Sequence, residues 1–475
     1  MTTFDPRALE RIRAGLDHPI IDGDGHIIEF MPAVREQIVR LGGESAAEVI
    51  DGFLAAPKLA RTLDLETRRA LGMYRMSWWA LPAENTLDRA TSMLPSLLDE
   101  RLPELGIDFA LVYPTLGLMI TAIEDADARR AVCRAFNHYY ADAFASHRER
   151  LAPVAVIPMH TPEEAVEELE YAHGLGLRAA VLEGHVHRPL PGKNESRVAR
   201  WIDSFGPDEP DAYDAVWQRC LDLGISPTFH SSGMGWPSRA SLTSYVFNHL
   251  GNFAVAGETT CRSLFLAGVP HRFPTLPFAF LEGGAAWGAN LYSDMLGHFE
   301  KRGAHALGGL DPSRIDRGEM KALFEKHAPE AFRRHLDRLG EGLAVLSDPE
   351  EDPATLDEFR HAAIEKPEDV RRVFADQFYF GCEADDPMNA LAFDTKTNPL
   401  GARLQAIFSS DIGHWDVPDM RCVLLEAHEA VDDGNMSPED FRRFTFSNAA
   451  SLFTATNPDF FAGTAVESAV ARELA

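Results

Sequence analysis

Carboxylate and imidazole side chains alternate in one short stretch near the start of the chain. Residues 20–30 read Ile-Ile-Asp-Gly-Asp-Gly-His-Ile-Ile-Glu-Phe, which spaces Asp22, Asp24 and His26 two residues apart. On a β-strand, side chains at this spacing share one face. An acid and an imidazole on one strand face can hold a metal ion together, which would compensate groups that are costly in a core. The Asp-Gly-Asp-Gly sequence is equally typical of a surface turn, and this stretch alone leaves both interpretations open.

Ionisable residues also end three later apolar runs. They are His230, Glu282, and Asp411 with His414 and Asp416 shortly after it. Two imidazoles and two carboxylates that converge would form a site suited to one Zn²⁺ or Mn²⁺, with room for water or substrate. Taken singly, His230 is better explained as a hydrogen-bonded core histidine, and Asp411 equally as the N-cap of a helix. The interpretation as a metal site depends on the fact that each of these ionisable residues stands at the end of an apolar run.

Eight apolar runs of strand length are separated by segments rich in helix formers. The runs begin near Ile20, Ile107, Leu151, Arg178, Ile225, Leu276, Gln377 and Ala406. Between the third and fourth runs, Thr161-Pro162-Glu163-Glu164 is typical of a helix start, which predicts a βαβ unit in a parallel sheet. Eight such strands favour a single α/β domain over residues 1–475, a closed (β/α)₈ or TIM barrel. Chemistry in such barrels takes place at the carboxyl ends of the strands, where the ionisable residues fall.

Two long segments do not fit the barrel repeat. They cover about residues 31–105 after strand 1 and about residues 299–370 between strands 6 and 7. Both are rich in helix formers, and we expect large helical insertions that cap the barrel mouth.

Composition excludes several classes of function. The 45 basic and 73 acidic residues give a net charge of -28, which argues against unaided binding to nucleic acid or to an anionic membrane surface. The five cysteines are scattered, so neither a disulfide framework nor a thiolate zinc site is expected. The sequence shows no signal peptide and no apolar run of membrane length. We expect a cytoplasmic protein with a small-molecule substrate, and a homodimer is the usual assembly for such an enzyme.

Four segments of the chain resemble the amidohydrolase-related family, the branch of the amidohydrolase superfamily that includes amino-carboxymuconate-semialdehyde decarboxylase. They are Asp24-Gly-His26, Phe229-His230, Gly283-Gly284 and Ser410-Asp411-Ile-Gly-His414. The resemblance implies that Asp24, His26, His230 and Asp411 bind one divalent metal ion, and that Asp411 also moves protons.

Glu282 departs from the family pattern, because the family often has His at this position. Glu282 is therefore a candidate metal ligand, a candidate general acid or base, or a residue that only holds a loop. His414 and Asp416 would orient Asp411 as partners behind the metal site, or anchor the loop.

The resemblance implies a metal-dependent hydrolase. Water activated by the metal would attack a carbonyl-type electrophile, with Asp411 accepting the proton. Non-oxidative decarboxylation of an aromatic or unsaturated acid, the reaction of a carboxy-lyase, is the alternative. A barrel that binds a ligand without turnover is a further alternative, because a fold does not fix a function.

The substrate is expected to be aromatic or otherwise apolar. Adjacent tryptophans either pack on the core or line a ligand cleft, and an arginine can pair with a substrate carboxylate. The histidines after strand 4 could contact substrate, bind metal, or form ordinary loop hydrogen bonds. The candidate substrate-binding residues are Trp78, Trp79, Arg75, His185, His187 and Arg188.

Overall fold

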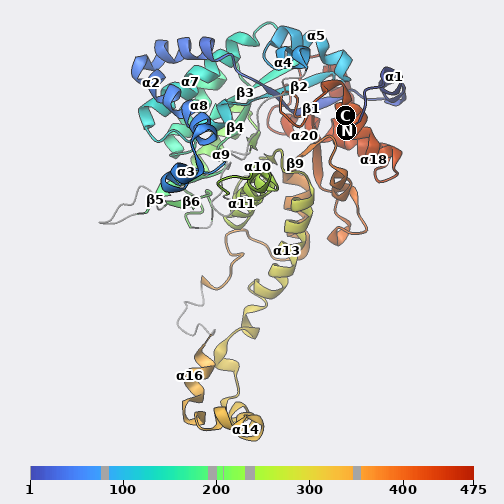
Figure 1. Ribbon diagram of the computed structural model, residues 1–475. Coiled ribbons are helices and arrows are strands. Elements are labelled where there is room, and N and C mark those ends of the chain that lie inside the picture. Colours follow the sequence, from blue (N-terminus) through green and yellow to red (C-terminus); the bar gives the residue numbers. More distant parts are fainter. Residues whose placement is uncertain (1, 76–84, 191–199, 207, 231–240, 346–354) are drawn as a thin grey trace.

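Eight parallel strands form a nearly closed barrel in the computed structural model, which describes residues 2–75, 85–190, 200–206, 208–230, 241–345 and 355–475 (Figure 1). In spatial order the strands are β1 (Ile21–Ile27), β2 (Phe109–Pro114), β3 (Leu151–Ile157), β4 (Ala179–Leu182), β7 (Pro227–Phe229), β8 (Phe278–Phe280), β9 (Phe378–Glu383) and β10 (Gln405–Ser409). Two backbone hydrogen bonds join β1 to the segment after β10: Asp411 N–H to the Asp24 carbonyl at 3.1 Å and His26 N–H to the Ile412 carbonyl at 3.2 Å. The predicted TIM barrel is confirmed.

Helices cover the outer face of the barrel, which explains why its strands are almost continuously apolar. The covering helices include α7 (Ala126–Ala143), α8 (Pro162–Gly174), α9 (Asp214–Leu223), α11 (Asn252–Leu266), α13 (Ala286–Arg302), α18 (Val423–Asp432) and α20 (Asn448–Thr454). At the start of α8 the Thr161 hydroxyl accepts the Glu164 N–H at 3.2 Å, as its sequence predicts. The fully buried Trp217 of α9 contacts Phe278 of β8 edge to face, with 5.6 Å between ring centroids.

The first insertion contains α2 (Met31–Thr62), α3 (Leu65–Leu71), α4 (Thr86–Thr91) and α5 (Pro95–Leu105). The long helix α2 packs along α7 on the flank of the barrel (Figure 1). A Cβ atom at Gly42 would lie 2.5 Å from the Ala131 Cβ atom, so this close approach requires glycine. Residue 75 reaches the segment after β7, where its N–H donates to the Ser241 carbonyl at 3.0 Å. Helix α2 therefore forms a flanking layer, whereas residue 75 lies beside the segment that follows β7. That the insertion caps the mouth stays a prediction.

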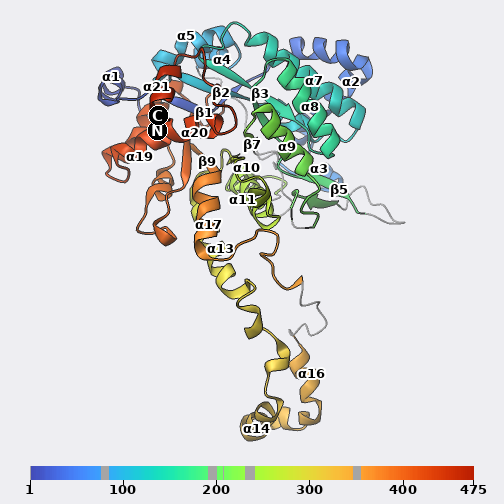
Figure 2. The same ribbon diagram turned by 180° about the vertical axis from the view of Figure 1, so that it is seen from behind.

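The second insertion forms an arm that projects away from the barrel (Figures 1 and 2). Its helices are α14 (Arg317–His327), α15 (Glu330–Arg333) and α16 (Leu339–Ala344), and none of the three contains a buried residue. The arm leaves after α13 and returns through α17 (Pro367–Arg372), which leads into β9. Helices of a (β/α)₈ barrel return the chain to the amino-terminal ends of the strands. The arm therefore starts at the end of the barrel opposite the mouth, whereas the sequence predicted that it would cap the mouth.

A short antiparallel ribbon after β4 was not predicted. It pairs β5 (Val186–Pro189) with β6 (Arg200–Asp203).

All five cysteines are free and buried, as expected from their scatter. In the described part of the chain, no helix combines the length and the apolar character that crossing a membrane requires.

Candidate metal centre

Asp24, His26, His230 and Asp411 meet at the carboxyl ends of β1, β7 and β10. His26 Nε2 lies 3.5 Å from Asp24 Oδ1 and 3.4 Å from Asp411 Oδ1. His230 Nε2 lies 3.4 Å from Asp24 Oδ1 and 3.1 Å from His26 Nε2. All four side chains are buried. Asp24, His26 and His230 thus form one group of donor atoms within 4.8 Å of one another, and Asp411 belongs to a second such group with His26, Glu282 and His414.

The orientation of His26 suits a metal ligand. Its Nδ1 lies 3.0 Å from the Pro114 carbonyl, which can only accept a hydrogen bond, so the ring proton belongs on Nδ1. The lone pair of Nε2 then faces the carboxylates. Burial lowers the pKa of His26 well below its ordinary value, and the nearby His414 and His230 add to this effect, so the ring is neutral. The two Nε2 atoms are 3.1 Å apart, so both imidazoles could serve as ligands of one cation.

Asp24 provides the clearest test of whether these residues fit a metal ion. Its side chain is fully buried, and neither carboxylate oxygen accepts a hydrogen bond from the described residues. Burial raises the pKa of Asp24 although the nearby His230 opposes this effect, because an enclosed carboxylate is costly to keep charged. A divalent cation would supply that compensation, and two imidazoles with two carboxylates suit Zn²⁺ or Mn²⁺. The side chains therefore form a candidate metal site.

Glu282 connects the two histidines beside this site. Its Oε2 lies 3.2 Å from His230 Nδ1, and its Oε1 lies 3.5 Å from His414 Nδ1. His414 Nδ1 also forms an ion pair of 2.6 Å with Asp411 Oδ1. Although burial opposes the charge, Asp411 and Glu282 raise the pKa of His414 well above its ordinary value. The arrangement therefore holds a protonated imidazole between two carboxylates.

Both of these carboxylates stand on unusual backbone. Glu282 has φ 63° and Asp411 has φ 49°, in the left-handed region that residues with a side chain rarely adopt. Asp tolerates this region better than Glu does. Such conformations persist where the surrounding structure enforces them, and they cluster at functional sites. Each turn bends the chain directly after its strand and aims the carboxylate into the barrel mouth.

The chain matches the amidohydrolase family over residues 101–345, which is more than half of its length. The chain belongs to the amidohydrolase family. An amidohydrolase from Mycobacterium avium subsp. paratuberculosis K-10 is 16% identical with a TM-score of 0.53, over 92% of this chain and 100% of that chain. This likeness shows the shared fold.

Two decarboxylases are also structurally similar to this amidohydrolase-family chain. The 2,6-dihydroxybenzoate decarboxylase from Rhizobium is 13% identical with a TM-score of 0.48, over 92% of this chain and 99% of that chain. The 5-carboxyvanillate decarboxylase from Novosphingobium aromaticivorans DSM 12444, solved with bound manganese, is 15% identical with a TM-score of 0.48, over 92% of this chain and 97% of that chain.

Two buried acids, Asp22 and Glu29, hold the backbone around the candidate metal site of this amidohydrolase-family chain, although neither is a candidate ligand. Asp22 was expected to share a face with Asp24, but a bulge between Asp22 and Gly25 turns it toward β10. Its Oδ1 accepts the Ser410 N–H at 2.9 Å, and burial raises its pKa to about 7. Glu29 accepts the N–H groups of residues 115–117, which follow the carbonyl that orients His26. The sequence analysis missed Glu29, although a single acid among the apolar residues 27–30 indicates a buried carboxylate.

An aromatic wall adjoins the carboxylates and was not found from the sequence. The Tyr245 ring of α10 (Tyr245–His249) lies 5.6 Å from the Trp415 ring and 5.0 Å from the His249 ring. Burial raises the pKa of Tyr245, and the negative charges of Asp416 and Glu282 add to the effect. These rings therefore lie near the acids at the barrel mouth, although no local motif marks them.

Another acid at the mouth was also missed. Glu383 ends β9, and burial raises its pKa well above the ordinary value, with Asp416 and Glu282 as the next causes. Burial raises the pKa of Asp411 well above its ordinary value. His414 opposes this effect, and Asp416, expected behind Asp411, adds to it. The mouth is thus rich in carboxylates.

The candidate substrate residues lie in different places. Trp78 and Trp79 are outside the described residues. Arg188 lies in the β5–β6 ribbon, where its Nε donates to Asp203 at 3.0 Å and its Nη2 to the Tyr213 hydroxyl at 2.8 Å. These contacts occupy the guanidinium that was expected to meet a substrate carboxylate.

The two histidines after β4 are neighbours but differ in environment. The rings of His185 and His187 are 5.3 Å apart, with His185 buried and His187 exposed. Burial lowers the pKa of His185 to about 3. For Arg75, the contacts of its backbone with Ser241 and Asn248 place it at the segment after β7.

Proposed function

We propose that this amidohydrolase-family chain is a divalent-metal-dependent enzyme that removes CO₂ from a small aromatic or unsaturated acid. The observation that supports metal dependence is Asp24, a fully buried carboxylate facing two imidazoles and having no hydrogen bond from the described residues. A bound divalent cation would offset the carboxylates and attract the acidic group of a substrate.

His414 favours decarboxylation over hydrolysis. Hydrolysis needs a base free to take a proton, whereas decarboxylation needs an acid that protonates the carbon losing CO₂. The ion pair of 2.6 Å between Asp411 and His414 engages the expected base with a cation. His414, with its raised pKa, then supplies the proton. The carbon–carbon bond breaks, its electron pair stays on the substrate carbon, and the His414 proton adds there as CO₂ leaves.

The aromatic wall would hold the rest of the substrate. Tyr245 and Trp415 offer ring faces and edges to a flat, apolar body. Glu282 would keep His414 oriented through its contact of 3.5 Å and return a proton to it after turnover. These roles assign Glu282 to proton transfer, one of the alternatives that its sequence position left open.

Hydrolysis is the second candidate, because the mouth is acidic. The negative charge of Asp416 would repel an anionic substrate and favour a neutral ester or amide. For such a substrate, Asp411 would act as the proton acceptor.

Elemental analysis of the purified protein tests metal dependence. We expect about one Zn²⁺ or Mn²⁺ per chain, lost in His26→Ala and Asp24→Asn variants that still fold. His298→Ala, which changes an exposed histidine on α13, is the matched control and should keep the metal. Full occupancy in both site variants would contradict the proposed ligands.

Product analysis separates the two reactions. Metal-loaded protein would be given a panel of aromatic and unsaturated carboxylic acids together with their amides and methyl esters. We expect CO₂ from an acid, and a rate at least about a hundredfold lower in His414→Gln, the size of effect typical of a lost general acid. Cleavage of an amide or ester without CO₂ would establish hydrolysis instead, and no product from the whole panel would count against both reactions.

A further inference from the structure

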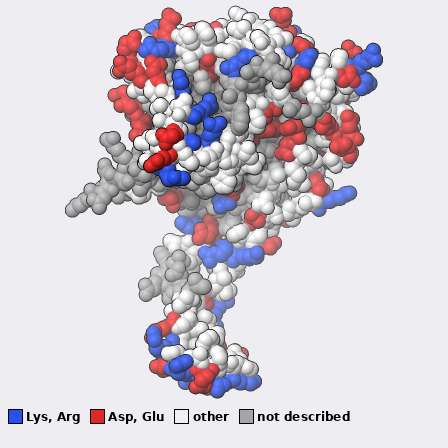
Figure 3. Space-filling view, viewed as in Figure 1, with Lys and Arg blue, Asp and Glu red and all other residues white. Residues whose placement is uncertain are grey.

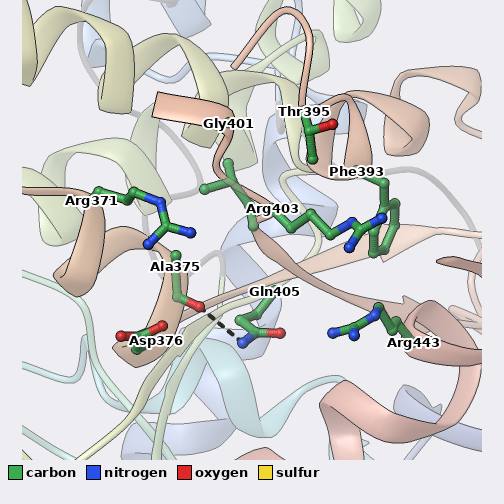
Figure 4. Close-up of a pocket in the computed structure, with 10 residues that line it drawn as sticks. Arg371, Ala375, Asp376, Phe393, Thr395, Gly401, Arg403, Gln405 and Arg443 are labelled. Atoms are coloured by element: carbon green, nitrogen blue, oxygen red, sulfur yellow. Dashed lines mark hydrogen bonds between the residues drawn. The ribbon is translucent and has the colours of Figure 1, made fainter. Parts of the chain in front are cut away.

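A second polar pocket lies at the opposite end of the barrel. Its volume is about 230 Å³, and it is lined by residues that precede β9 and β10 (Figure 4). Gln405 is the first residue of β10, the strand whose other end leads to Asp411. The pocket and the candidate metal site are therefore separated by the length of the strand, and the pocket takes no part in the chemistry proposed above.

Three arginines dominate the lining. Arg371 belongs to α17, Arg403 precedes β10, and Arg443 begins the π-helical turn Arg443–Ser447. Figure 4 shows the Arg371 and Arg443 side chains extending toward the pocket from opposite sides. Among the described residues, Asp376 is the only acid in the lining. A pocket with this charge contrasts with a chain whose net charge is -28.

The guanidinium groups retain hydrogen-bonding capacity. Arg371 forms no ion pair or side-chain hydrogen bond with the described residues, and the Nε atoms of Arg371 and Arg443 are buried without an acceptor. Arg403 contacts Asp440 at 3.4 Å and Arg443 contacts Glu439 at 3.4 Å, and both acids lie outside the lining. Buried donors without acceptors are costly. These donors are arranged to receive an external acceptor.

We propose that this pocket binds a small oxyanion of the phosphate class, either the free ion or the phosphoryl group of a small molecule. Arginine is well suited to such groups because its planar fork of donors matches their oxygens. The volume of about 230 Å³ corresponds to about eight water molecules at about 30 Å³ each, which accommodates a phosphate with a few further atoms. The oxyanion would link α17, β10 and the π-helical turn.

Calorimetric titration with inorganic phosphate and with glycerol 3-phosphate tests this proposal. Experiments use the full-length, metal-loaded protein at about 0.15 M salt, where exposed charges are largely screened. We expect saturable binding with a Kd below about 1 mM and an affinity at least about tenfold lower in Arg371→Gln. The matched control is Arg372→Gln, which removes the same charge from the exposed neighbour on α17 and should bind as the wild type does.

Several results would overturn the proposal. Absence of saturable binding for both probes would do so, as would equal weakening by Arg371→Gln and Arg372→Gln. The Asp24→Asn variant distinguishes the two ends of the barrel: retained binding supports the arginine pocket, whereas lost binding assigns the anion to the metal centre. If Arg371→Gln does not fold, Arg443→Gln gives the same test from the other side. Stronger binding of glycerol 3-phosphate than of phosphate would identify an organic phosphate as the ligand.

Discussion

At the scale of single residues, the site places acids where the backbone is least suited to them. Glu282 follows β8 with φ 63°, and its carboxylate lies 3.2 Å from His230 and 3.5 Å from His414. A glycine would adopt this backbone without strain, but it would provide no carboxylate. The strained backbone at residue 282 therefore lowers stability, and it places a carboxylate that the proposed reaction would use.

Replacing Glu282 by Gly and by Ala separates strain from charge. Both variants lack the carboxylate, and we expect both to lose most activity. Only Gly relieves the left-handed backbone, so Glu282→Gly should be more stable than Glu282→Ala by about 1 kcal/mol in chemical denaturation. The same pair at Glu383, within β9, should show the opposite order because glycine weakens a strand. Equal stability of the two residue-282 variants would argue against strain there.

At the scale of elements, the sequence predicts what local pattern determines. Apolar runs located the starts of all eight strands to within about two residues, and the polar residues that end these runs, such as His230, pointed to the candidate site. Features that depend on contacts distant in sequence were missed. The β5–β6 ribbon depends on the pairing of residues 186–189 with residues 200–203, and the aromatic wall depends on the contact between Tyr245 and Trp415. The hydrophobic periodicity of a sequence does not predict contacts between residues that are distant in the chain.

A buried polar cluster joins two helices to a strand on the barrel flank. Asn137 of α7 accepts the Val156 N–H of β3 at 2.8 Å and donates to the Val156 carbonyl at 3.0 Å. It also donates to Glu168 of α8 at 2.8 Å. Burial raises the pKa of Glu168 to about 7, against the lowering effects of Asn137 and Arg134. Glu168 is therefore largely protonated in the folded chain below about pH 7.

This raised pKa predicts how stability depends on pH. Between about pH 4.5 and pH 7 the unfolded chain releases the Glu168 proton while the folded chain keeps it, so stability falls as pH rises. At 1.36 kcal/mol per pKa unit, Glu168 should contribute a loss of about 3 kcal/mol across this interval. Denaturation curves at several pH values should show a shallower decline for Glu168→Gln. Glu167→Gln, which changes the exposed neighbour, should follow the wild type, and parallel curves for all three proteins would refute this role.

At the scale of the whole molecule, the two ends of the barrel differ in architecture. The mouth holds the candidate metal site and its aromatic wall, whereas the opposite end holds the arginine pocket and the base of the arm (Figures 1 and 4). The arm carries both signs of charge along its surface (Figure 3). Its three helices contain no buried residue, so they add little to the barrel core.

The arm should therefore be dispensable for the fold of the barrel. Arg302 at the end of α13 forms an ion pair of 3.6 Å with Glu358, so the segments that enter and leave the arm meet at its base. A Gly/Ser linker of about eight residues, which can span more than 20 Å, could replace residues 304–355. We expect the melting temperature to change by less than about 3 °C and the metal content to stay the same.

Phe359 provides the contrasting variant, because it lies where the returning chain packs on the barrel. Its side chain is buried, with its ring 5.4 Å from that of Phe299 and 6.4 Å from that of Phe265. Removing such a side chain costs about 3 to 5 kcal/mol, so Phe359→Ala should lower the melting temperature more than deletion of the entire arm. If the deletion instead destabilises the protein as much as Phe359→Ala does, or lowers its metal content, the arm is part of the barrel's cooperative unit rather than an attachment to it.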